Sequence, residues 1–539
     1  MLSSDNTTTL AIVPIFVNTG AALLPTILGA LASVAAIVFK PRELLRVCRR
    51  RPYIPVIVLF VAVGAYFGIS YGLKHAGQNS QSVRTNRQHI DWSQVAIQLI
   101  RDKERAQQLA GIGPVATVGG NESSEQAGAK MYRGNALRNG YAGGGSPVDL
   151  VPLWEYGDNW SMYPSSPVVV DNKVFGASCL VDPPDTYGAV FCLDAKTGEE
   201  LWYADLKNPD TEAEFRGFFS SPAVTADGRY LVIGQGMHYD ANCELVCLDT
   251  TSGDVHWLIE TTLHIEGSPA IEGDLCVAGA GAIEVGDDHK AQGDPGFVLG
   301  VRISDGTELW RYALNDPESS PAIDSGIAYI GSGVNGSAVV ALRTEPDEQL
   351  QQEGLDRLVW QTQTPHPATG AVTLTEELVL IGCGNSNYVF IAENPEGFVL
   401  ALDRKSGAVR WEVSVPDAVL GAIAVREDTA ICPVRNGEVI AINLAKDGEI
   451  LWRTRINDNT PVLAGPAFTG EFVYAVSQDG YIVILNADDG TEVERHYINA
   501  PGKPGELGLS VSSPYVTGGR VYLGSETGGL RCFVGKEVK

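Results

Sequence analysis

One short stretch of this 539-residue chain combines side chains that could hold a metal ion. Glu284, Asp287, Asp288, His289 and Asp294 fall close together, among glycines that leave the chain free to bend. A hard cation such as calcium prefers several oxygen ligands on a flexible loop. The spacing does not match the Asp-x-Asp-x-Asp-Gly pattern of a calcium loop, however. A solvated acidic loop is therefore the favoured interpretation, and a metal site formed by these five residues is the weaker alternative.

Two further polar insertions are candidates for binding, His238 to Asp240 and Asn385 to Tyr388. Function is often carried by loops on a rigid framework, although such loops are more often merely solvated. The sequence contains no Gly-x-Ser-x-Gly elbow, no metalloprotease helix and no phosphate-binding loop. We therefore predict no catalytic residues, and the balance of the sequence favours a protein that is not an enzyme.

The cysteines leave two interpretations open. Cys179 and Cys192 flank a short polar loop, and they are the best candidates for a disulfide across a hairpin. The alternative is that they are small buried side chains, because Cys192, Cys247 and Cys532 share one repeat position. No Cys-x-x-Cys pair and no zinc-ligand spacing occur.

These loops must be positioned by a repeated element, because the tryptophans recur at intervals of 41 to 55 residues. Most follow a glycine by four residues, which predicts a strand, a tight turn and a second strand that ends in the indole. The tryptophans of the ladder are Trp154, Trp202, Trp257, Trp310, Trp360, Trp411 and Trp452. The turn glycines are Gly198, Gly253, Gly306, Gly407, Gly448 and Gly490.

A second ladder of small residues runs in phase with the first and counts eight units. Each Ser-Pro or Gly-Ala/Pro pair, such as Ser166-Pro167 and Gly421-Ala422, precedes an alternating apolar run. Four strands in each unit of about 50 residues are typical of a propeller blade. The last unit holds only three strands, so its fourth must come from Val151 to Tyr156. The sequence thus predicts an all-β fold, an eight-bladed propeller of four-stranded antiparallel blades over residues 131–539.

The repeat Asp-x-x-Thr/Ser-Gly-x-x-x-Trp resembles the quinoprotein-type propeller repeat, which is named after pyrroloquinoline quinone (PQQ), and the resemblance covers residues 131–539. It implies that each tryptophan docks between neighbouring blades, on the backbone near the next glycine turn. Three positions depart from the pattern. Glu494 occupies the seventh tryptophan position, Arg302 replaces an aspartate, and an insertion at 345–358 precedes Trp360.

Within that family, the resemblance favours the non-enzymatic branch. The catalytic members bind PQQ and calcium and carry an adjacent Cys-Cys pair, which is absent here. The chain resembles the outer-membrane assembly propeller lipoproteins, which act as scaffolds. We therefore expect a non-catalytic scaffold that binds envelope proteins or peptides, with no cofactor. The alternative is a quinoprotein-like oxidoreductase or small-ligand binder that uses PQQ and calcium in the propeller channel.

The first 74 residues predict a membrane anchor. Apolar segments at about 10–39 and 53–73 are each long enough to cross a bilayer. The loop between them, 40–52, holds six basic residues and would stay in the cytoplasm. We therefore expect two transmembrane helices in the inner (cytoplasmic) membrane and a propeller on the periplasmic side. A single signal-anchor helix is the alternative.

The remaining residues and the charge complete the sequence-based picture. Residues 75–130 are predicted to be a linker with a short amphipathic helix at about 91–110. The chain carries a formal net charge of −26. Nucleic acid is therefore an unsuitable partner, because phosphate binding requires clustered basic side chains.

Overall fold

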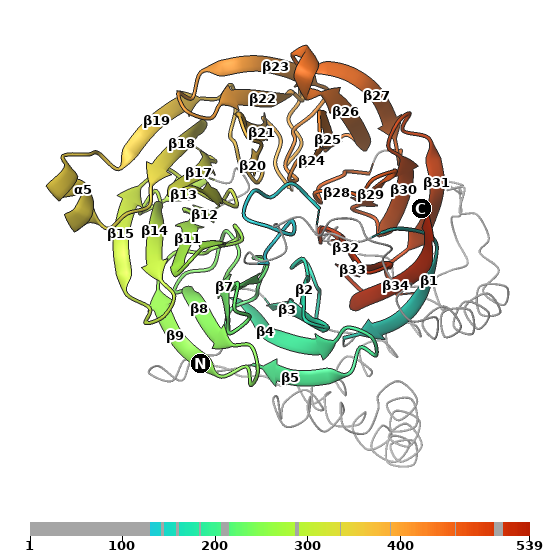
Figure 1. The fold of residues 1–539 in the computed structure, drawn as a ribbon, viewed down its shortest axis with the longest axis horizontal. Helices are drawn as coiled ribbons and strands as arrows, with labels where there is room; N and C mark the ends of the chain where they lie inside the picture. Colours follow the sequence, from blue (N-terminus) through green and yellow to red (C-terminus); the bar gives the residue numbers. More distant parts are fainter. Residues whose placement is uncertain are drawn as a thin grey trace, which may run out of the picture. The chain divides into compact units, whose positions relative to one another are not determined.

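The computed structural model forms a closed ring of eight blades around a central axis (Figure 1). Each blade is a four-stranded antiparallel sheet, with its first strand innermost and its fourth strand on the rim. The predicted eight-bladed, all-β propeller is therefore confirmed. The structure describes residues 130–538, apart from 142–144, 158–160, 183–184, 206–214, 286–289, 335, 389, 459 and 501–509.

The strands of the first four blades are listed from the axis outward. Blade 1 contains β2 (Val168–Val170), β3 (Lys173–Asp182), β4 (Asp185–Asp194) and β5 (Glu200–Ala204); blade 2 contains β6 (Ala223–Val224), β7 (Tyr230–Gly234), β8 (Glu244–Asp249) and β9 (Val255–Glu260). Blade 3 contains β10 (Ala270–Glu272), β11 (Leu275–Ala280), β14 (Phe297–Arg302) and β15 (Glu308–Ala313), with an inserted hairpin of β12 (Ile283–Val285) and β13 (Lys290–Gln292); blade 4 contains β16 (Ala322–Asp324), β17 (Ile327–Ser332), β18 (Ala338–Arg343) and β19 (Leu358–Gln363).

The other four blades follow the same order. Blade 5 contains β20 (Thr373–Leu374), β21 (Leu378–Gly384), β22 (Gly397–Asp403) and β23 (Val409–Val415); blade 6 contains β24 (Ala424–Arg426), β25 (Thr429–Val434), β26 (Glu438–Asn443) and β27 (Glu449–Arg455). Blade 7 contains β28 (Ala467–Phe468), β29 (Phe472–Ser477), β30 (Tyr481–Asn486) and β31 (Glu492–Tyr497); blade 8 contains β32 (Tyr515–Thr517), β33 (Arg520–Gly524), β34 (Leu530–Val538) and β1 (Ser146–Tyr156). Two short helices complete the described elements, α5 (Asp347–Glu353), which projects beyond the rim in Figure 1, and η2 (Leu444–Lys446).

The ring is closed by pairing its first strand with its last. β1 runs antiparallel to β34 from Tyr156, opposite Leu530, to Ser146, opposite Val538. The predicted origin of the missing fourth strand is confirmed, and the pairing extends beyond the predicted residues 151–156. Because β1 covers the outer edge of β34, blade 8 has the same four strands as the others, and no interior strand is left unpaired.

The turn before each rim strand follows from its sequence, as Asp194 to Gly198 illustrate. The Asp194 carboxylate accepts hydrogen bonds from the main-chain N–H groups of Lys196 and Thr197, both at 2.9 Å. The Gly198 N–H then donates to the Asp194 carbonyl, with Gly198 at a φ of 70°. Glycine adopts this left-handed conformation without the steric cost of a side chain. The motif therefore encodes a short, rigid turn.

The indoles of the ladder lie between blades, on the turns of the next blade. A Cβ added to any of the six turn glycines would lie within 2.9 Å of a ring, so only glycine allows this approach. Six indole N–H groups also donate to a main-chain carbonyl: Trp154 to Ala195 (3.1 Å), Trp202 to Thr250 (2.9 Å), Trp257 to Ile303 (2.6 Å), Trp310 to Thr344 (2.9 Å), Trp360 to Arg404 (3.1 Å) and Trp452 to Ala487 (2.8 Å). Each ring thus buries apolar area and satisfies its polar group at one point.

Two departures from the repeat are compensated by side chains elsewhere in the chain. At Arg302 the missing turn acceptor is supplied by Asp274, whose carboxylate accepts from the Ser304 N–H at 2.8 Å. In blade 4 the insertion containing α5 replaces the glycine turn. There the Arg357 guanidinium lies 4.4 Å from the centre of the Trp310 ring, a cation–π contact.

Glu494, the third departure, joins blade 7 to the closing strand β1 as a hydrogen-bond acceptor, whereas the tryptophans at the equivalent positions are donors. Its carboxylate accepts from the N–H groups of Asp149 (3.0 Å) and Leu150 (3.1 Å) on β1. We expect Glu494→Ala to lower the free energy of unfolding by about 1–2 kcal/mol, because two N–H donors lose a charged acceptor. Urea titration measures this change. Glu492→Ala, which removes an exposed carboxylate of the same strand, is the control, and an equal effect of both changes would contradict the assignment.

The second ladder forms a hydrogen-bonded chain around the inner ring. Each serine accepts, through its hydroxyl oxygen, a hydrogen bond from the N–H of the equivalent residue in the preceding blade. The donor–acceptor pairs are Gly465 to Ser513 (3.0 Å), Ser513 to Ser166 (2.8 Å), Ser166 to Ser221 (3.0 Å), Ser221 to Ser268 (2.9 Å) and Ser268 to Ser320 (2.8 Å). Blades 5, 6 and 7 carry Gly370, Gly421 and Gly465 at this position and have no hydroxyl to contribute.

The predicted anchor and linker lie outside the described residues. This applies to the apolar segments at 10–39 and 53–73, the basic loop at 40–52 and the helix expected at 91–110. Within the part of the chain that the structure describes, no helix combines the length and the apolar character that crossing a bilayer requires.

Candidate functional site

Most of the candidate metal ligands lie outside the residues that the structure describes. Asp287, Asp288 and His289 lie outside the described residues, and only the main chain of Glu284 is described, in β12. Asp294 is exposed, and its carboxylate accepts a hydrogen bond from the Gly296 N–H at 3.0 Å. Among the described residues no group of three or more His, Cys, Asp or Glu side chains is placed to hold a metal ion.

The suggested disulfide does not form in the structure. Cys179 lies opposite Gly188 and Cys192 lies opposite Phe175, so the two cysteines do not face each other across the β3–β4 hairpin. Both are free and fully buried, and burial raises the pKa of both thiols, that of Cys192 to about 12. The alternative interpretation, small buried side chains, describes them better. The reason is that the hairpin register depends on the loop length, which the spacing of cysteines alone does not specify.

Residues 130–141 cross the centre of the ring, and we call them the axial segment (Figure 1). Their main chain pairs with the innermost part of five blades, so the axis is occupied by the chain itself. The hydrogen-bonded pairs are Lys130 with Val224, Ala136 with Ile323, Leu137 with Leu374, Asn139 with Val425 and Gly140 with Phe468. The sequence marked this stretch as the start of the propeller but did not predict that it crosses the centre of the ring.

Two arginines fix the axial segment to the inner ring. Arg138 has no solvent exposure, and its guanidinium donates to the carbonyls of Ser268 (2.6 Å), Pro269 (2.9 Å) and Pro321 (2.5 Å). Arg133, also buried, donates to the carbonyls of Gly465 (2.8 Å) and Pro466. The carbonyls of the second ladder thus accept the planar fork of donors that only arginine provides.

The loops that join the second to the third strand of each blade share one face with the connections between blades. On this face, which we call the loop face, His238 of the first polar insertion meets Glu266. The His238 N–H donates to the Glu266 carboxylate at 2.5 Å, and the His238 ring lies 3.4 Å from it. Burial alone would raise the pKa of Glu266, but the neighbouring His238 and His264 lower it, so this carboxylate is ionised.

His264 beside this pair is buried, and its Nε2 lies 2.9 Å from the Glu318 carboxylate. Burial lowers the pKa of His264 from 6.5 to about 4. The unfolded imidazole takes up a proton below pH about 6.5, whereas the folded one stays neutral down to about 4. Acidification through this window therefore favours the unfolded chain.

We expect the free energy of unfolding to fall by up to about 3 kcal/mol between pH 6.5 and 4 through His264, at about 1.4 kcal/mol for each pKa unit. Denaturation at several pH values should give a steeper pH dependence for the wild type than for His264→Gln. His256→Gln removes an exposed histidine and is the control. An unchanged slope in His264→Gln would contradict the prediction.

The second polar insertion lies in the loop at 385–396 between β21 and β22, which we call the blade 5 loop. It is held by its own asparagines. The Asn387 side chain accepts from the Phe390 N–H at 2.6 Å, and the Asn385 side chain accepts from the Glu396 N–H at 2.8 Å. Arg435 of blade 6 donates to the Asn387 carbonyl at 2.6 Å. Hydrogen bonds therefore hold the loop at its tip and at its base, and a third connects it to blade 6.

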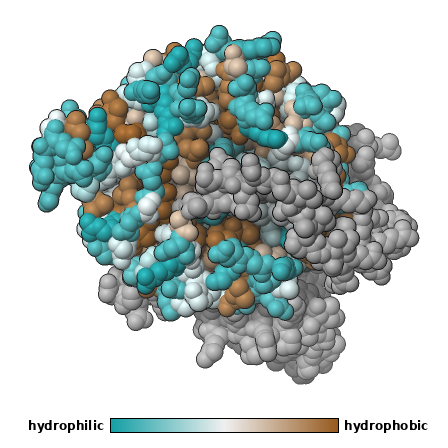
Figure 2. All heavy atoms as spheres, viewed as in Figure 1, coloured by the Kyte–Doolittle hydropathy of each residue, from teal (hydrophilic) through white to brown (hydrophobic). Residues whose placement is uncertain are grey.

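The blade 5 loop presents apolar side chains to solvent. Phe390 is 50% exposed and Ile391 is 60% exposed. Most other large exposed hydrophobics are single residues on rim strands, such as Leu201 on β5 and Val493 on β31. In the space-filling view, hydrophobic residues interrupt the hydrophilic surface in several patches (Figure 2). The sequence analysis singled out the polar start of this loop and missed its apolar tip.

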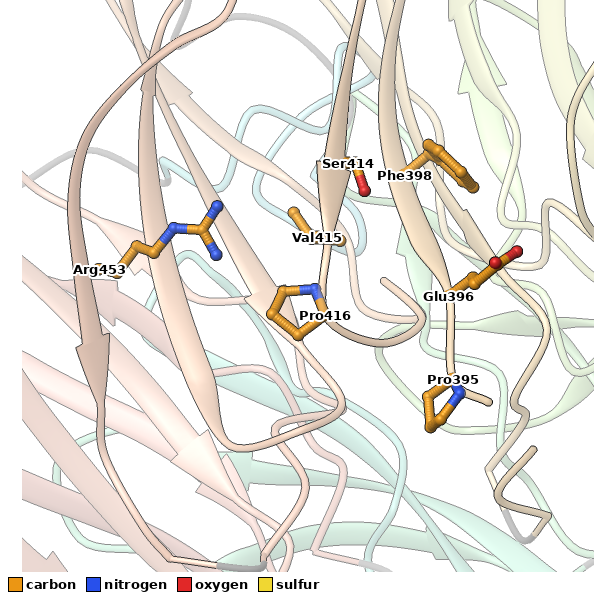
Figure 3. A pocket seen from close by; sticks show the side chains of 7 residues that line it. All are labelled: Pro395, Glu396, Phe398, Ser414, Val415, Pro416 and Arg453. Atoms are coloured by element: carbon orange, nitrogen blue, oxygen red, sulfur yellow. The ribbon is translucent and has the colours of Figure 1, made fainter. Parts of the chain in front are cut away.

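A groove of about 380 Å³ lies at the base of the same loop, between blades 5 and 6 (Figure 3). Pro395 and Glu396 of the loop line one side, and Arg453 extends from β27 on the other. The end of β23 lies between them. The remaining lining residues are Phe398, Ser414, Val415 and Pro416.

The fold and these surfaces define the class of protein. It is a closed propeller of the quinoprotein-like repeat, with its axis occupied by its own chain and with loops gathered on one face. The chain belongs to the family described as outer membrane protein assembly factor BamB, whose model matches residues 186–345 and 352–537. The resemblance seen in the repeat is thereby confirmed.

Relatives of known name agree with this assignment. The outer membrane protein assembly factor BamB of Salmonella typhimurium is 25% identical over 371 residues, which cover 67% of this chain and 82% of the relative. The one from Yersinia pestis is 23% identical over 361 residues, with 65% and 80% covered.

Two solved structures show the same fold. BamB from Moraxella catarrhalis has a TM-score of 0.51 at 16% identity and covers 72% of this chain and 98% of its own. Quinohemoprotein alcohol dehydrogenase from Comamonas testosteroni has a TM-score of 0.54 at 15% identity and covers 81% of this chain and 85% of its own. At such identities the likeness concerns the fold alone.

The predicted location in the inner membrane, as a multi-pass protein, is contradicted by the relatives. They are named as outer membrane protein assembly factors. The prediction rested on apolar length and on loop charge, and the segments at 10–39 and 53–73 that carried it lie outside the described residues. Apolar length measures the tendency to leave water and does not identify one particular membrane.

Proposed function

We propose that this chain is a non-catalytic scaffold that binds polypeptides of the cell envelope during the assembly of outer membrane proteins. The observation that carries the proposal is its membership of the assembly-factor family, over most of the propeller. The blade 5 loop supports a binding role, because hydrogen bonds within a loop reduce the conformational entropy that its exposed apolar side chains lose when a partner covers them. Interaction through the loop face is the finer part of the proposal.

The experiment combines loss of the protein with crosslinking in the cells that produce it. Depletion should lower the amount of folded outer membrane β-barrel proteins. A photo-crosslinking residue in place of Phe390 should capture proteins of the assembly machinery, and the same residue in place of Leu201, on the rim of blade 1, should not. Unchanged β-barrel protein levels together with no captured assembly protein would refute the proposal.

The oxidoreductase alternative requires sites for PQQ and calcium. Among the described residues, no group of three acidic, histidine or cysteine side chains lies close enough to hold an ion, and this observation favours the scaffold. The axial segment, moreover, occupies the centre of the ring with its own hydrogen bonds. Addition of PQQ and calcium, followed by a dye-linked dehydrogenase assay, tests the alternative directly. Turnover of an alcohol or sugar would favour it over the scaffold.

A further inference from the structure

The contact surface between blades 5 and 6 differs at the rim from the surfaces on either side of it. We call each surface between two neighbouring blades a seam. The flanking seams have two side-chain hydrogen bonds each, one from the indole N–H of the ladder tryptophan and one from the hydroxyl of a threonine two residues later. They are Trp360 to Arg404 (3.1 Å) and Thr362 to Gly407 (2.6 Å) between blades 4 and 5, and Trp452 to Ala487 (2.8 Å) and Thr454 to Gly490 (2.6 Å) between blades 6 and 7.

Trp411 occupies the ladder position at the seam between blades 5 and 6. Within the part of the chain that the structure describes, its N–H makes no hydrogen bond, whereas the other six ladder indoles each donate to a carbonyl. The turn that receives the Trp411 ring runs from Asn443 to Gly448 and contains η2. It is one residue longer than the turn from Asp403 to Gly407, which receives Trp360. We attribute the missing acceptor to this longer turn.

Val413 stands two residues after Trp411, where the flanking seams have a threonine. Its Cγ2 methyl group takes the place of the threonine hydroxyl. A Cβ added to Gly448 would lie 2.6 Å from this methyl group, and a Cβ added to Gly490 would lie 2.5 Å from the Thr454 Oγ1. The side chain thus approaches the turn glycine equally closely in both seams, but valine forms no hydrogen bond there.

The inner side of the seam between blades 5 and 6 keeps a polar contact. The serine chain of the inner ring is interrupted at the seams from blade 4 to blade 7. Here the Thr373 hydroxyl donates to the Ile423 carbonyl at 2.8 Å instead. At the loop face, Arg435 donates to the Asn387 carbonyl at 2.6 Å. Among the described residues, the hydrogen bonds across this seam therefore lie near the axis and at the loop face, and the rim is held by apolar packing.

We propose that the ring opens locally at the rim of the seam between blades 5 and 6, with the contact of Thr373 and Ile423 as the hinge. Parts of a protein with few polar contacts open at a lower free energy than the whole chain unfolds. The groove already separates the end of β23 from Arg453 on β27 at this seam (Figure 3), and the opening would widen it. The inference concerns a movement of the fold and goes beyond the scaffold function.

Native cysteines report on the opening of individual seams, because each is fully buried in the closed ring. Cys432 lies in the apolar cluster of blades 5 and 6 that contains Trp411, and Cys383 lies in the cluster of blades 4 and 5. Cys247 lies in the cluster of blades 2 to 4, and Cys532 of the closing blade lies in another. Labelling of the full chain with N-ethylmaleimide, followed by mass spectrometry of peptides, gives the rate at each thiol.

Each rate is divided by the rate of the same thiol in the unfolded chain, which leaves the fraction of time that the seam is open. We expect this fraction to be about 30-fold larger for Cys432 than for Cys383, because two hydrogen bonds of ordinary strength are missing. It should also exceed the fractions for Cys247 and Cys532.

Two matched variants exchange the side chains of the two seams. Val413→Thr restores a hydroxyl beside Gly448 and should slow the labelling of Cys432 by about five-fold, the effect of one hydrogen bond, without changing that of Cys383. Thr362→Val removes the hydroxyl from the seam between blades 4 and 5. It should speed the labelling of Cys383 by a similar factor and leave Cys432 unchanged.

Three results would overturn the proposal. Equal corrected rates at all four thiols would mean that the ring opens only when the whole chain unfolds. Fastest labelling of Cys532 would place the opening at the closing blade. Unchanged labelling of Cys432 in Val413→Thr would show that the rim hydrogen bonds do not control the seam. None of these results bears on the scaffold function, which depletion and crosslinking test separately.

Discussion

Replacing Arg138 by alanine is expected to lower the free energy of unfolding by about 3–5 kcal/mol, because a buried charged network loses its central donor. The guanidinium binds carbonyls of blades 3 and 4 and the Tyr132 carbonyl of the axial segment at 3.1 Å. Burial lowers the pKa of Arg138 to about 9, so the side chain remains protonated at neutral pH. Without it, several buried carbonyls have no partner, and the axial segment loses one of its two attachments through arginine.

Chemical denaturation followed by tryptophan fluorescence measures this loss. Arg138→Lys keeps the charge but not the planar fork, and it should recover only part of the stability. Arg229→Ala, at an exposed position in blade 2, is the control for removing an arginine. If the free energy of unfolding of Arg138→Ala lay within about 1 kcal/mol of the wild-type value, the axial segment would be held without this arginine. That result would contradict the cost expected for unpaired buried groups.

Replacing Trp310 by alanine should have an effect of similar size, about 3–5 kcal/mol, as expected for deletion of a buried aromatic side chain. Trp310 is only 2% exposed. Its ring lies beneath the Arg357 guanidinium, and its N–H donates to the Thr344 carbonyl of blade 4. The change would leave a cavity between two blades and an unpaired carbonyl.

Trp310→Phe separates the two contributions, because it keeps most of the apolar ring and loses the N–H donor. Trp310→Phe should lower the free energy of unfolding by about 1–2 kcal/mol less than the alanine variant does. The retained ring fills most of the cavity, and the loss that remains includes one buried hydrogen bond. Both variants can be compared by thermal unfolding. An alanine variant as stable as the wild type would show that this tryptophan does not join the blades.

The repeat predicted the architecture because each short motif determines the local structure of one blade and because the motif recurs along the chain. Asp194, Gly198 and Trp202 define a turn and a rim strand, and the same pattern recurs around the ring with small changes. Eight units with three strands in the last one leave a single way to complete the sheet, so the pairing of β1 with β34 could be predicted as well. Closure follows from counting, without knowledge of any side-chain contact.

What the sequence did not predict depends on contacts between distant residues. Asp274 takes the role of the aspartate missing at position 302, and Glu494 reverses the polarity of a tryptophan contact. No sequence pattern marks either residue for this role. The role of Arg138 could not be predicted for the same reason. Its acceptors in blades 3 and 4 are main-chain carbonyls more than 100 residues away, and a main-chain carbonyl has no side-chain signature in the sequence.

The candidate site was predictable only in part. The start of the blade 5 loop was singled out for its asparagines, which the structure shows to be hydrogen-bonded within the loop. The sequence analysis did not single out Phe390 and Ile391, because an apolar residue type alone does not reveal that a side chain is exposed. The groove requires Pro395 of blade 5 and Arg453 of blade 6 together, and their proximity exists only in the folded ring.

The pairing of β1 with β34 has a consequence for biogenesis. A ribosome releases Ser146 long before Val538, so the first strand must wait for its partner while seven blades form. This one pairing spans almost the whole propeller sequence, and such a long-range closure predicts slow completion of the ring and a period in which an open strand edge is exposed to other nascent chains. A chain truncated before its last thirty or so residues would have no such partner, and general chaperones and proteases would encounter it as an unfinished protein.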